Sequence, residues 1–108
     1  MTTEELILRL CAADGTSGDE EEAARAAAAA FPGCARTAVD ALGNLTAVLN
    51  PGAEPGGILL DAHLDKIGLA VTGIDENGFL RVAPCGGVDR RVLPGAPVTV
   101  RGREPLPG

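Results

Sequence analysis

His63 is the only histidine of the chain, and Asp65 follows it by two residues. Side chains two residues apart lie on the same face of an extended backbone. A carboxylate beside an imidazole can hold one ring nitrogen and leave the other for a metal ion. One histidine does not complete a catalytic metal site, and a hydrogen-bonded structural histidine is the alternative interpretation. Metal chemistry at His63 is therefore a hypothesis that needs support from the rest of the sequence.

Two helices are predicted ahead of this motif. Thr2 and Glu5 have the spacing of a capping box, in which a hydroxyl and a carboxylate bond the first free amides of a helix. Ser17 and Glu20 repeat this spacing before the alanine-rich segment 23–30. The pattern therefore predicts two short helices within the first third of the chain.

Short strands are predicted after the helices. The expected strands are 36–39, 45–49 and 58–62, with a turn over 40–44 and a loop over 51–57. Asp40 and Asn44 are expected to shape the turn through local hydrogen bonds. The run 58–62 is apolar except for Asp61, which is typical of a strand covered on both faces. Helices followed by such a strand indicate a layered α/β unit.

The pattern changes near Gly68, and no helix is predicted beyond it. Strands over 69–74 and 79–83 flank Asn77 and Gly78, a dipeptide that favours a type I′ hairpin turn. A further strand is predicted over residues 98–100, and Asp89 is expected to act in capping or in domain contacts. The second part is therefore expected to form a small antiparallel sheet or barrel, distinct from the first part.

Composition narrows the classes of protein that the chain can represent. The formal net charge of −6 disfavours binding to nucleic acid or to an anionic membrane surface, and we expect neither as a partner. The chain has no Trp or Tyr, so the expected core is aliphatic. Three widely spaced cysteines match neither a disulfide framework nor a zinc site, which favours a cytoplasmic protein.

Five short signatures occur in order along the chain. They are Thr16–Glu20, Asp40–Leu45, Ala62–Gly68, Ile74–Phe79 and Gly86–Asp89. Together they resemble the N-terminal portion of the glutamyl aminopeptidase and tetrahedral (deblocking) aminopeptidase family, metallopeptidase family forty-two. The His-x-Asp pair alone is a weak signal, because related two-metal peptidases share it. The ordered set of signatures carries the resemblance over nearly the whole chain.

The resemblance implies an activity and a metal site. Members of this family remove N-terminal residues from peptides, with two divalent metal ions, commonly zinc or cobalt. The resemblance implies that His63 is a ligand to one metal and that Asp65 orients the imidazole ring of His63. The family's other metal ligands and its general-base Glu lie downstream of the matched region. We therefore expect an N-terminal fragment of a two-metal aminopeptidase, inactive alone.

The resemblance also implies a fold. Family members have an α/β/α catalytic domain interrupted by a smaller β-barrel-like domain, and the complete proteins form homo-oligomers. Residues 1–67 would then be the start of the catalytic domain and residues 68–108 the first part of the inserted domain, both incomplete. Lys66 stands where the family usually has an acid, and strand alternation predicts that it points away from His63 and Asp65.

Two other functions remain open from the sequence. The first is a non-catalytic, truncated paralogue that docks onto full-length subunits through its β region. The second, weaker alternative is a stand-alone metal-binding protein that uses His63 and one or two carboxylates, which are few ligands for tight binding.

Overall fold

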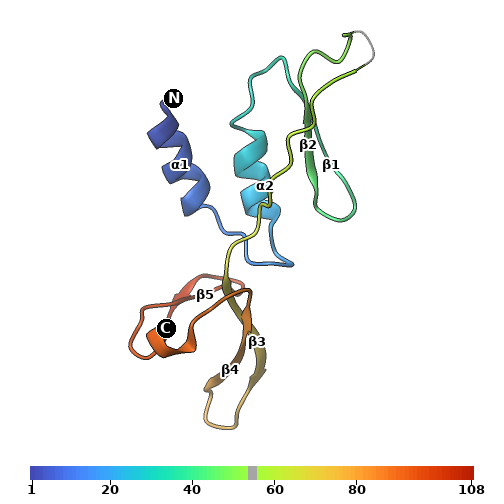
Figure 1. The fold of residues 1–108 in the computed structure, drawn as a ribbon. Helices are drawn as coiled ribbons and strands as arrows, with labels where there is room; N and C mark the ends of the chain where they lie inside the picture. Colours follow the sequence, from blue (N-terminus) through green and yellow to red (C-terminus); the bar gives the residue numbers. More distant parts are fainter. Residues whose placement is uncertain (54–55) are drawn as a thin grey trace.

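The computed structural model describes residues 1–53 and 56–108. In chain order its elements are α1 (Thr3–Ala12), α2 (Glu21–Ala28), β1 (Arg36–Val39), β2 (Leu45–Val48), β3 (Gly68–Ile74), β4 (Leu80–Cys85), the 3₁₀ turn η1 (Arg90–Val92), β5 (Thr99–Val100) and β6 (Leu106–Pro107). Figure 1 shows α1, α2, β1 and β2 in one lobe and the strands from β3 onward in another. Helices and antiparallel strand pairs together give the α/β content that the sequence predicts.

The two lobes make an elongated and open molecule. Its radius of gyration is 17.7 Å and its extents are 61 × 30 × 27 Å. A compact chain of this length has a radius of gyration of about 13 Å. The accessible surface is 8945 Å², against roughly 5,600 Å² for a compact protein of this mass. Much of the apolar surface therefore stays in contact with solvent.

The aliphatic core that composition predicts is not formed by the described residues, so this prediction is wrong. The buried apolar side chains are Ala13, Ala23 and Ala24, at the contact between α1 and α2. Each of the three sheets described has only two strands. Helix α2 contacts β2, but a two-stranded sheet with at most one short helix against it cannot enclose large side chains.

The first predicted helix is confirmed, including its cap. The backbone N–H of Glu5 donates to Thr2 Oγ1 at 3.2 Å, and the backbone N–H of Thr2 donates to Glu5 Oε2 at 2.6 Å. Both halves of the capping box therefore satisfy amides that the helix leaves free.

The second predicted capping box is wrong, although the second helix is present. The hydroxyl of Ser17 donates to Asp65 and accepts from no amide of the helix, and Glu20 Oε1 accepts from the backbone N–H of Gly18 at 2.7 Å. Since both side chains have other partners, α2 begins at Glu21 with no side-chain cap.

The strands predicted over 36–39 and 45–49 are confirmed as β1 and β2, and the structure pairs them across a turn that depends on Asp40. The strands are antiparallel, with Val39 opposite Leu45. One oxygen of Asp40 accepts from the backbone N–H groups of Leu42 and Asn44, both at 2.9 Å. The local hydrogen bonds expected of Asp40 and Asn44 are therefore present.

The predicted hairpin β3–β4 is also confirmed, but its turn type is wrong. A type I′ turn needs a positive φ at both central residues, and in this turn only Gly78 has one, at 86°. The Asp75 carboxylate accepts from the backbone N–H groups of Asn77 and Phe79, both at 2.9 Å. These two bonds favour a three-residue loop that ends in a left-handed glycine, as in the turn of β1–β2.

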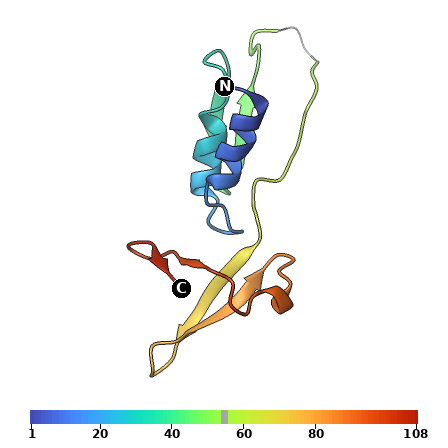
Figure 2. The ribbon, with the colours of Figure 1, turned by 90° about the vertical axis from the view of Figure 1, so that its left-hand side faces the viewer.

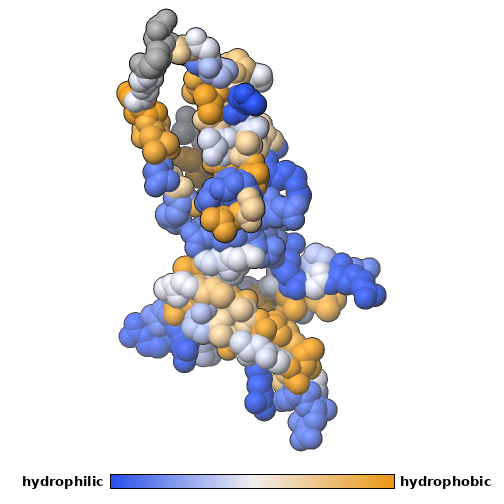
Figure 3. Space-filling view, turned by 90° about the vertical axis from the view of Figure 1, so that its right-hand side faces the viewer, coloured by the Kyte–Doolittle hydropathy of each residue, from blue (hydrophilic) through white to orange (hydrophobic). Residues whose placement is uncertain are grey.

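The strand predicted over 58–62 is not formed, and its expected burial is wrong. Ile58, Leu59 and Leu60 are each 89% exposed. Figure 2 shows this part of the chain arching away from the helices, and Figure 3 shows apolar surface open to solvent on both lobes. An apolar run becomes a strand only when a neighbour accepts its backbone hydrogen bonds. Within residues 1–53 and 56–108, no strand pairs with it.

The C-terminal lobe contains two elements that periodicity did not predict, the 3₁₀ turn η1 and the strand β6. The carboxylate of Asp89 accepts from the backbone N–H of Arg91 at 3.0 Å and caps η1, which confirms the capping role expected of Asp89. Strand β6 pairs with β5 in antiparallel register. The loop expected over 51–57 includes residues 54–55, which lie outside the described residues.

An ion pair joins the two lobes. The guanidinium of Arg101, next to β5, contacts the carboxylate of Asp14 after α1.

Among the described residues, no helix has both the length and the apolar character required to span a lipid bilayer. The division into parts of a catalytic and an inserted domain at residues 67 and 68 stays a prediction.

Candidate metal-ligand site

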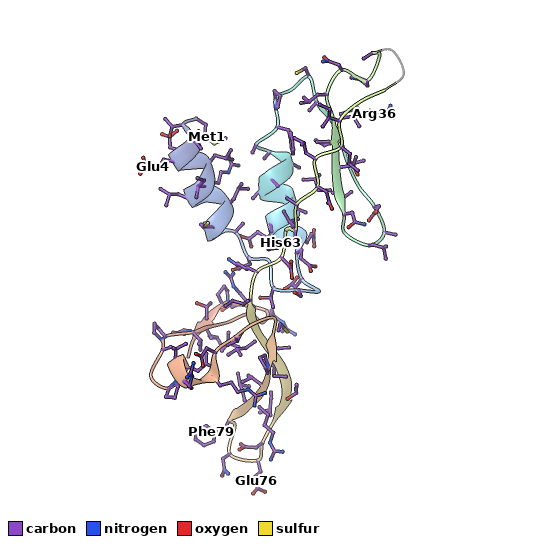
Figure 4. The ribbon with its side chains drawn as sticks, viewed as in Figure 1. Met1, Glu4, Arg36, His63, Glu76 and Phe79 are labelled. Carbon is purple, nitrogen blue, oxygen red and sulfur yellow. The ribbon has the colours of Figure 1, made fainter. Side chains whose placement is uncertain are left out.

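His63 lies in the segment that joins the two lobes, as Figure 4 shows. Its Nδ1 is 3.1 Å from Asp65 Oδ1 and 3.0 Å from the Asp65 carbonyl oxygen. Both partners only accept hydrogen bonds, so Nδ1 must carry the proton as donor. The neutral ring then has its lone pair on Nε2, and the imidazole is 86% exposed. The structure therefore brings together the two residues that the sequence singles out.

Asp65 has a second partner, which sequence reasoning missed. The hydroxyl of Ser17 donates to Asp65 Oδ2, on the oxygen that His63 does not use. The Ser17 hydroxyl, and next the His63 ring, hold the pKa of Asp65 below its ordinary value. Ser17 lies in the first of the five signatures, but its spacing to Glu20 favoured the interpretation as a helix cap.

The loop between α1 and α2 is held against this segment by its backbone. The N–H of Lys66 donates to the carbonyl oxygen of Gly15 at 2.7 Å, and Thr16 forms an isolated bridge with Lys66. A Cβ on Gly68 would lie only 2.8 Å from Thr16 Cγ2. Glycine at this position therefore permits the close approach that places Ser17 beside Asp65.

Lys66 extends toward the end of α1. Its ammonium nitrogen donates to the carbonyl oxygens of Ala13, at 2.5 Å, and Cys11, at 3.3 Å. A cation at a helix C-terminus satisfies free carbonyls and interacts favourably with the helix dipole. The predicted orientation of Lys66 assumed a regular strand, whereas the segment before it is irregular. Contact with α1 determines the direction of this side chain instead.

The residues described fit one ligand position of a metal centre but not a whole centre. His63 can offer Nε2, because Asp65 occupies Nδ1. A catalytic zinc site needs about three protein ligands. Within residues 1–53 and 56–108, no group of three or more His, Cys, Asp or Glu side chains could hold a metal ion. This donor set does not support a stand-alone metal-binding protein.

Comparison with known proteins agrees with the sequence signatures. The chain is 40% identical over 87 residues to a protein of Acetivibrio thermocellus named "Putative aminopeptidase", a match over 80% of this chain and 26% of that relative. It is 34% identical over 98 residues to "Putative aminopeptidase FrvX" of Escherichia coli K12, over 90% of this chain and 27% of the relative. It is 50% identical over 50 residues to the "Lysyl aminopeptidase" of Pyrococcus furiosus, over 46% of this chain and 14% of the relative.

The chain thus covers 14% to 27% of the lengths of these three relatives. The sequence model of one family, described as M42 glutamyl aminopeptidase, matches residues 43–108, a range that includes His63, Asp65 and the whole C-terminal lobe. The chain belongs to this aminopeptidase family.

Proposed function

We propose that the chain is the N-terminal portion of a two-metal aminopeptidase that removes N-terminal residues from peptides. The observation that carries the proposal is the exposed imidazole of His63, whose Nδ1 is held by Asp65. This arrangement leaves Nε2 as the free ligand atom of a family motif. His63 would be a metal ligand, and Asp65 would fix its ring.

In the complete enzyme, two divalent ions such as zinc or cobalt would supply an activated water and polarise the scissile carbonyl. Of the residues in this chain, His63 would bind a metal ion and Asp65 would orient the His63 ring. Asp65 keeps the proton on Nδ1 of His63, which presents the Nε2 lone pair. Since one imidazole is too small a donor set, we expect the chain to be inactive alone.

The proposal also covers the domains, the substrates, the cellular location and the oligomeric state of the complete enzyme. Residues 1–67 would belong to the α/β/α catalytic domain and residues 68–108 to a barrel-like inserted domain. Peptides would be the substrates, and the complete protein would be a cytoplasmic homo-oligomer. The net charge of −6 supports a protein that binds neither nucleic acid nor an anionic membrane surface.

Complementation tests this function. The chain is co-expressed with the part of the Acetivibrio thermocellus relative that follows its aligned region, and release of an N-terminal chromogenic amide is assayed with zinc or cobalt. We expect hydrolysis by the mixture and by neither part alone. The variant His63→Ala should abolish it, whereas Asp61→Ala, in the same exposed segment, should retain it. Hydrolysis that survives His63→Ala would contradict the proposal.

The coding sequence downstream gives an independent test. A continuing or frameshifted frame should encode the remaining Asp ligand, the adjacent Glu pair and a second His. A downstream sequence without these residues would contradict the fragment interpretation, whatever the complementation assay shows.

A second candidate function is docking of a non-catalytic paralogue onto full-length subunits. The observation that favours it is the exposed run of Ile58, Leu59 and Leu60, each 89% accessible. Contiguous exposed apolar side chains are typical of interaction sites. Co-purification with a full-length family member, lost in Leu59→Glu, would support docking. A monomer that captures no such subunit would exclude it.

A further inference from the structure

The two carboxylate oxygens of Asp65 have different partners. Oδ1 accepts from Nδ1 of His63 at 3.1 Å, and Oδ2 accepts from the hydroxyl of Ser17. Ser17 and His63 are 46 positions apart in the sequence, so the fold must bring them to the same carboxylate. Asp65 is only part-buried, its side chain being 41% exposed, and solvent alone would leave its orientation free.

The position of Ser17 is set by a tight loop. The backbone N–H of Asp19 donates to the carbonyl oxygen of Thr16 at 2.8 Å, and Gly18 has a φ of 92°, which closes the turn around Ser17. Just before it, Gly15 accepts from the backbone N–H of Lys66 at 2.7 Å. These backbone contacts, one within the turn and one just before it, therefore place the Ser17 hydroxyl next to Asp65.

We propose that Ser17 is a positioning residue that acts on His63 through Asp65. By holding Oδ2, the Ser17 hydroxyl fixes the plane of the carboxylate, and Oδ1 then stays in line with Nδ1 of His63. The proton is kept on Nδ1, and the lone pair is kept on Nε2. The value of this tautomer for metal binding rests on the proposed function, whereas the positioning itself does not.

The single histidine makes a direct test possible. Long-range ¹H–¹⁵N correlation spectra report which imidazole nitrogen carries the proton, and only His63 contributes signals. The full chain is measured without metal, at a pH where the ring is neutral. The variants are Ser17→Ala, Ser17→Thr, which keeps a hydroxyl, and Thr72→Ala. Thr72 is the matched control, because its hydroxyl donates to the Arg81 carbonyl oxygen in the other lobe.

In the unmodified chain we expect the proton mainly on Nδ1. Ser17→Ala should lower the ratio of the Nδ1–H to the Nε2–H form by at least about threefold, since one hydrogen bond of the carboxylate is lost. Ser17→Thr should restore most of the ratio, and Thr72→Ala should leave it unchanged. Backbone amide spectra establish that each variant is folded.

Two results would overturn the inference. One is a proton mainly on Nε2 in the unmodified chain, which needs no variant to fold. The other is a ratio that stays the same in folded Ser17→Ala. Neither result depends on metal or on activity. Failure of the aminopeptidase proposal would instead appear as hydrolysis that persists in His63→Ala, so the two failures are distinguishable.

Discussion

The ammonium nitrogen of Lys66 donates a hydrogen bond to the carbonyl oxygen of Ala13, 2.5 Å away, directly after the last residue of α1. The two residues are 53 positions apart, and their contact ties the helix to the segment that carries His63. A carboxylate in place of the Lys66 ammonium would face these carbonyl oxygens with no hydrogen to donate. The lysine is therefore matched to the helix end that it contacts.

Replacing Lys66 with methionine should loosen the end of α1. The apolar stem remains, but the charge at the helix C-terminus is lost, which costs about 0.3–1 kcal/mol for exposed groups. Hydrogen exchange of the last-turn amides of α1 should accelerate by up to about fivefold. Arg103→Met removes a cation elsewhere and is the control. Equal acceleration in both variants would show that net charge, and not this contact, is responsible.

Replacing Gly68 with alanine should separate the α1–α2 loop from the His63 segment. The new Cβ would lie 2.8 Å from Thr16 Cγ2, so Thr16 or the backbone must move. Such overpacking costs roughly 1–3 kcal/mol. The measurement is the chemical shift of the Ser17 amide, together with the urea midpoint of unfolding.

Two further variants control for this effect. Gly87→Ala should be neutral, because a Cβ at this position would have no neighbouring atom within 4 Å. Thr16→Ala combined with Gly68→Ala should recover part of the loss, since the clashing side-chain atoms are removed. A double variant no better than Gly68→Ala alone would contradict the steric explanation.

The turn between β1 and β2 should weaken in acid because of Asp40. The side chain of Asn44 donates to Asp40 Oδ2 at 2.9 Å, and this bond is the largest cause that lowers the pKa of Asp40. A carboxyl with a lowered pKa stabilises the fold above its unfolded pKa and loses this effect as the pH falls through its folded pKa. After correction for intrinsic exchange rates, the protection of the Leu42 and Asn44 amides should therefore be constant above about pH 4. Below that pH, their protection should fall.

The matching variant is Asp40→Ala, which should lack this acid transition and show low protection at every pH. Asp61→Ala removes a carboxylate from the exposed segment and should keep the transition. An acid transition of equal size in Asp40→Ala would assign it to another group.

The sequence predicts the elements that depend on local contacts. The Thr2 cap and the turn at Asp40 are confirmed because their partners lie within four residues. The Ser17 bond to Asp65 spans 48 positions, and no short-range pattern contains it. The run 58–62 fails for a related reason. Its apolar composition favours burial. A strand also needs a neighbouring strand for its backbone hydrogen bonds, and the local sequence does not determine whether one is present.

Breaking the ion pair of Arg101 with Asp14 should free the two lobes from one another. The side chains are 50% and 32% exposed, so the pair contributes only up to about 1 kcal/mol. It is nevertheless a charged contact between lobes that are otherwise sparsely packed. In Arg101→Ala, the radius of gyration from small-angle scattering should rise, and the unmodified chain should approach this value at high salt.

The control for this prediction is Arg91→Ala, which breaks an ion pair with Asp89 inside one lobe. Its radius of gyration should match that of the unmodified chain. The charge exchange that combines Asp14→Arg with Arg101→Asp should restore the original value. Expansion in Arg91→Ala as large as in Arg101→Ala would show that the lobes respond to charge in general.

Leu59→Glu should reduce self-association of the chain. Leu59 is 89% exposed between two equally exposed apolar residues. Such a run, without a strand partner among the described residues, can pair with the same segment of another copy. Sedimentation velocity over a range of concentrations should show association of the unmodified chain and a shift toward monomer in the variant. Leu42→Glu is the matched control, because Leu42 is 88% exposed but lies alone in a turn. Equal loss of association in both variants would show that added negative charge suffices, and would contradict a specific role for the 58–60 run.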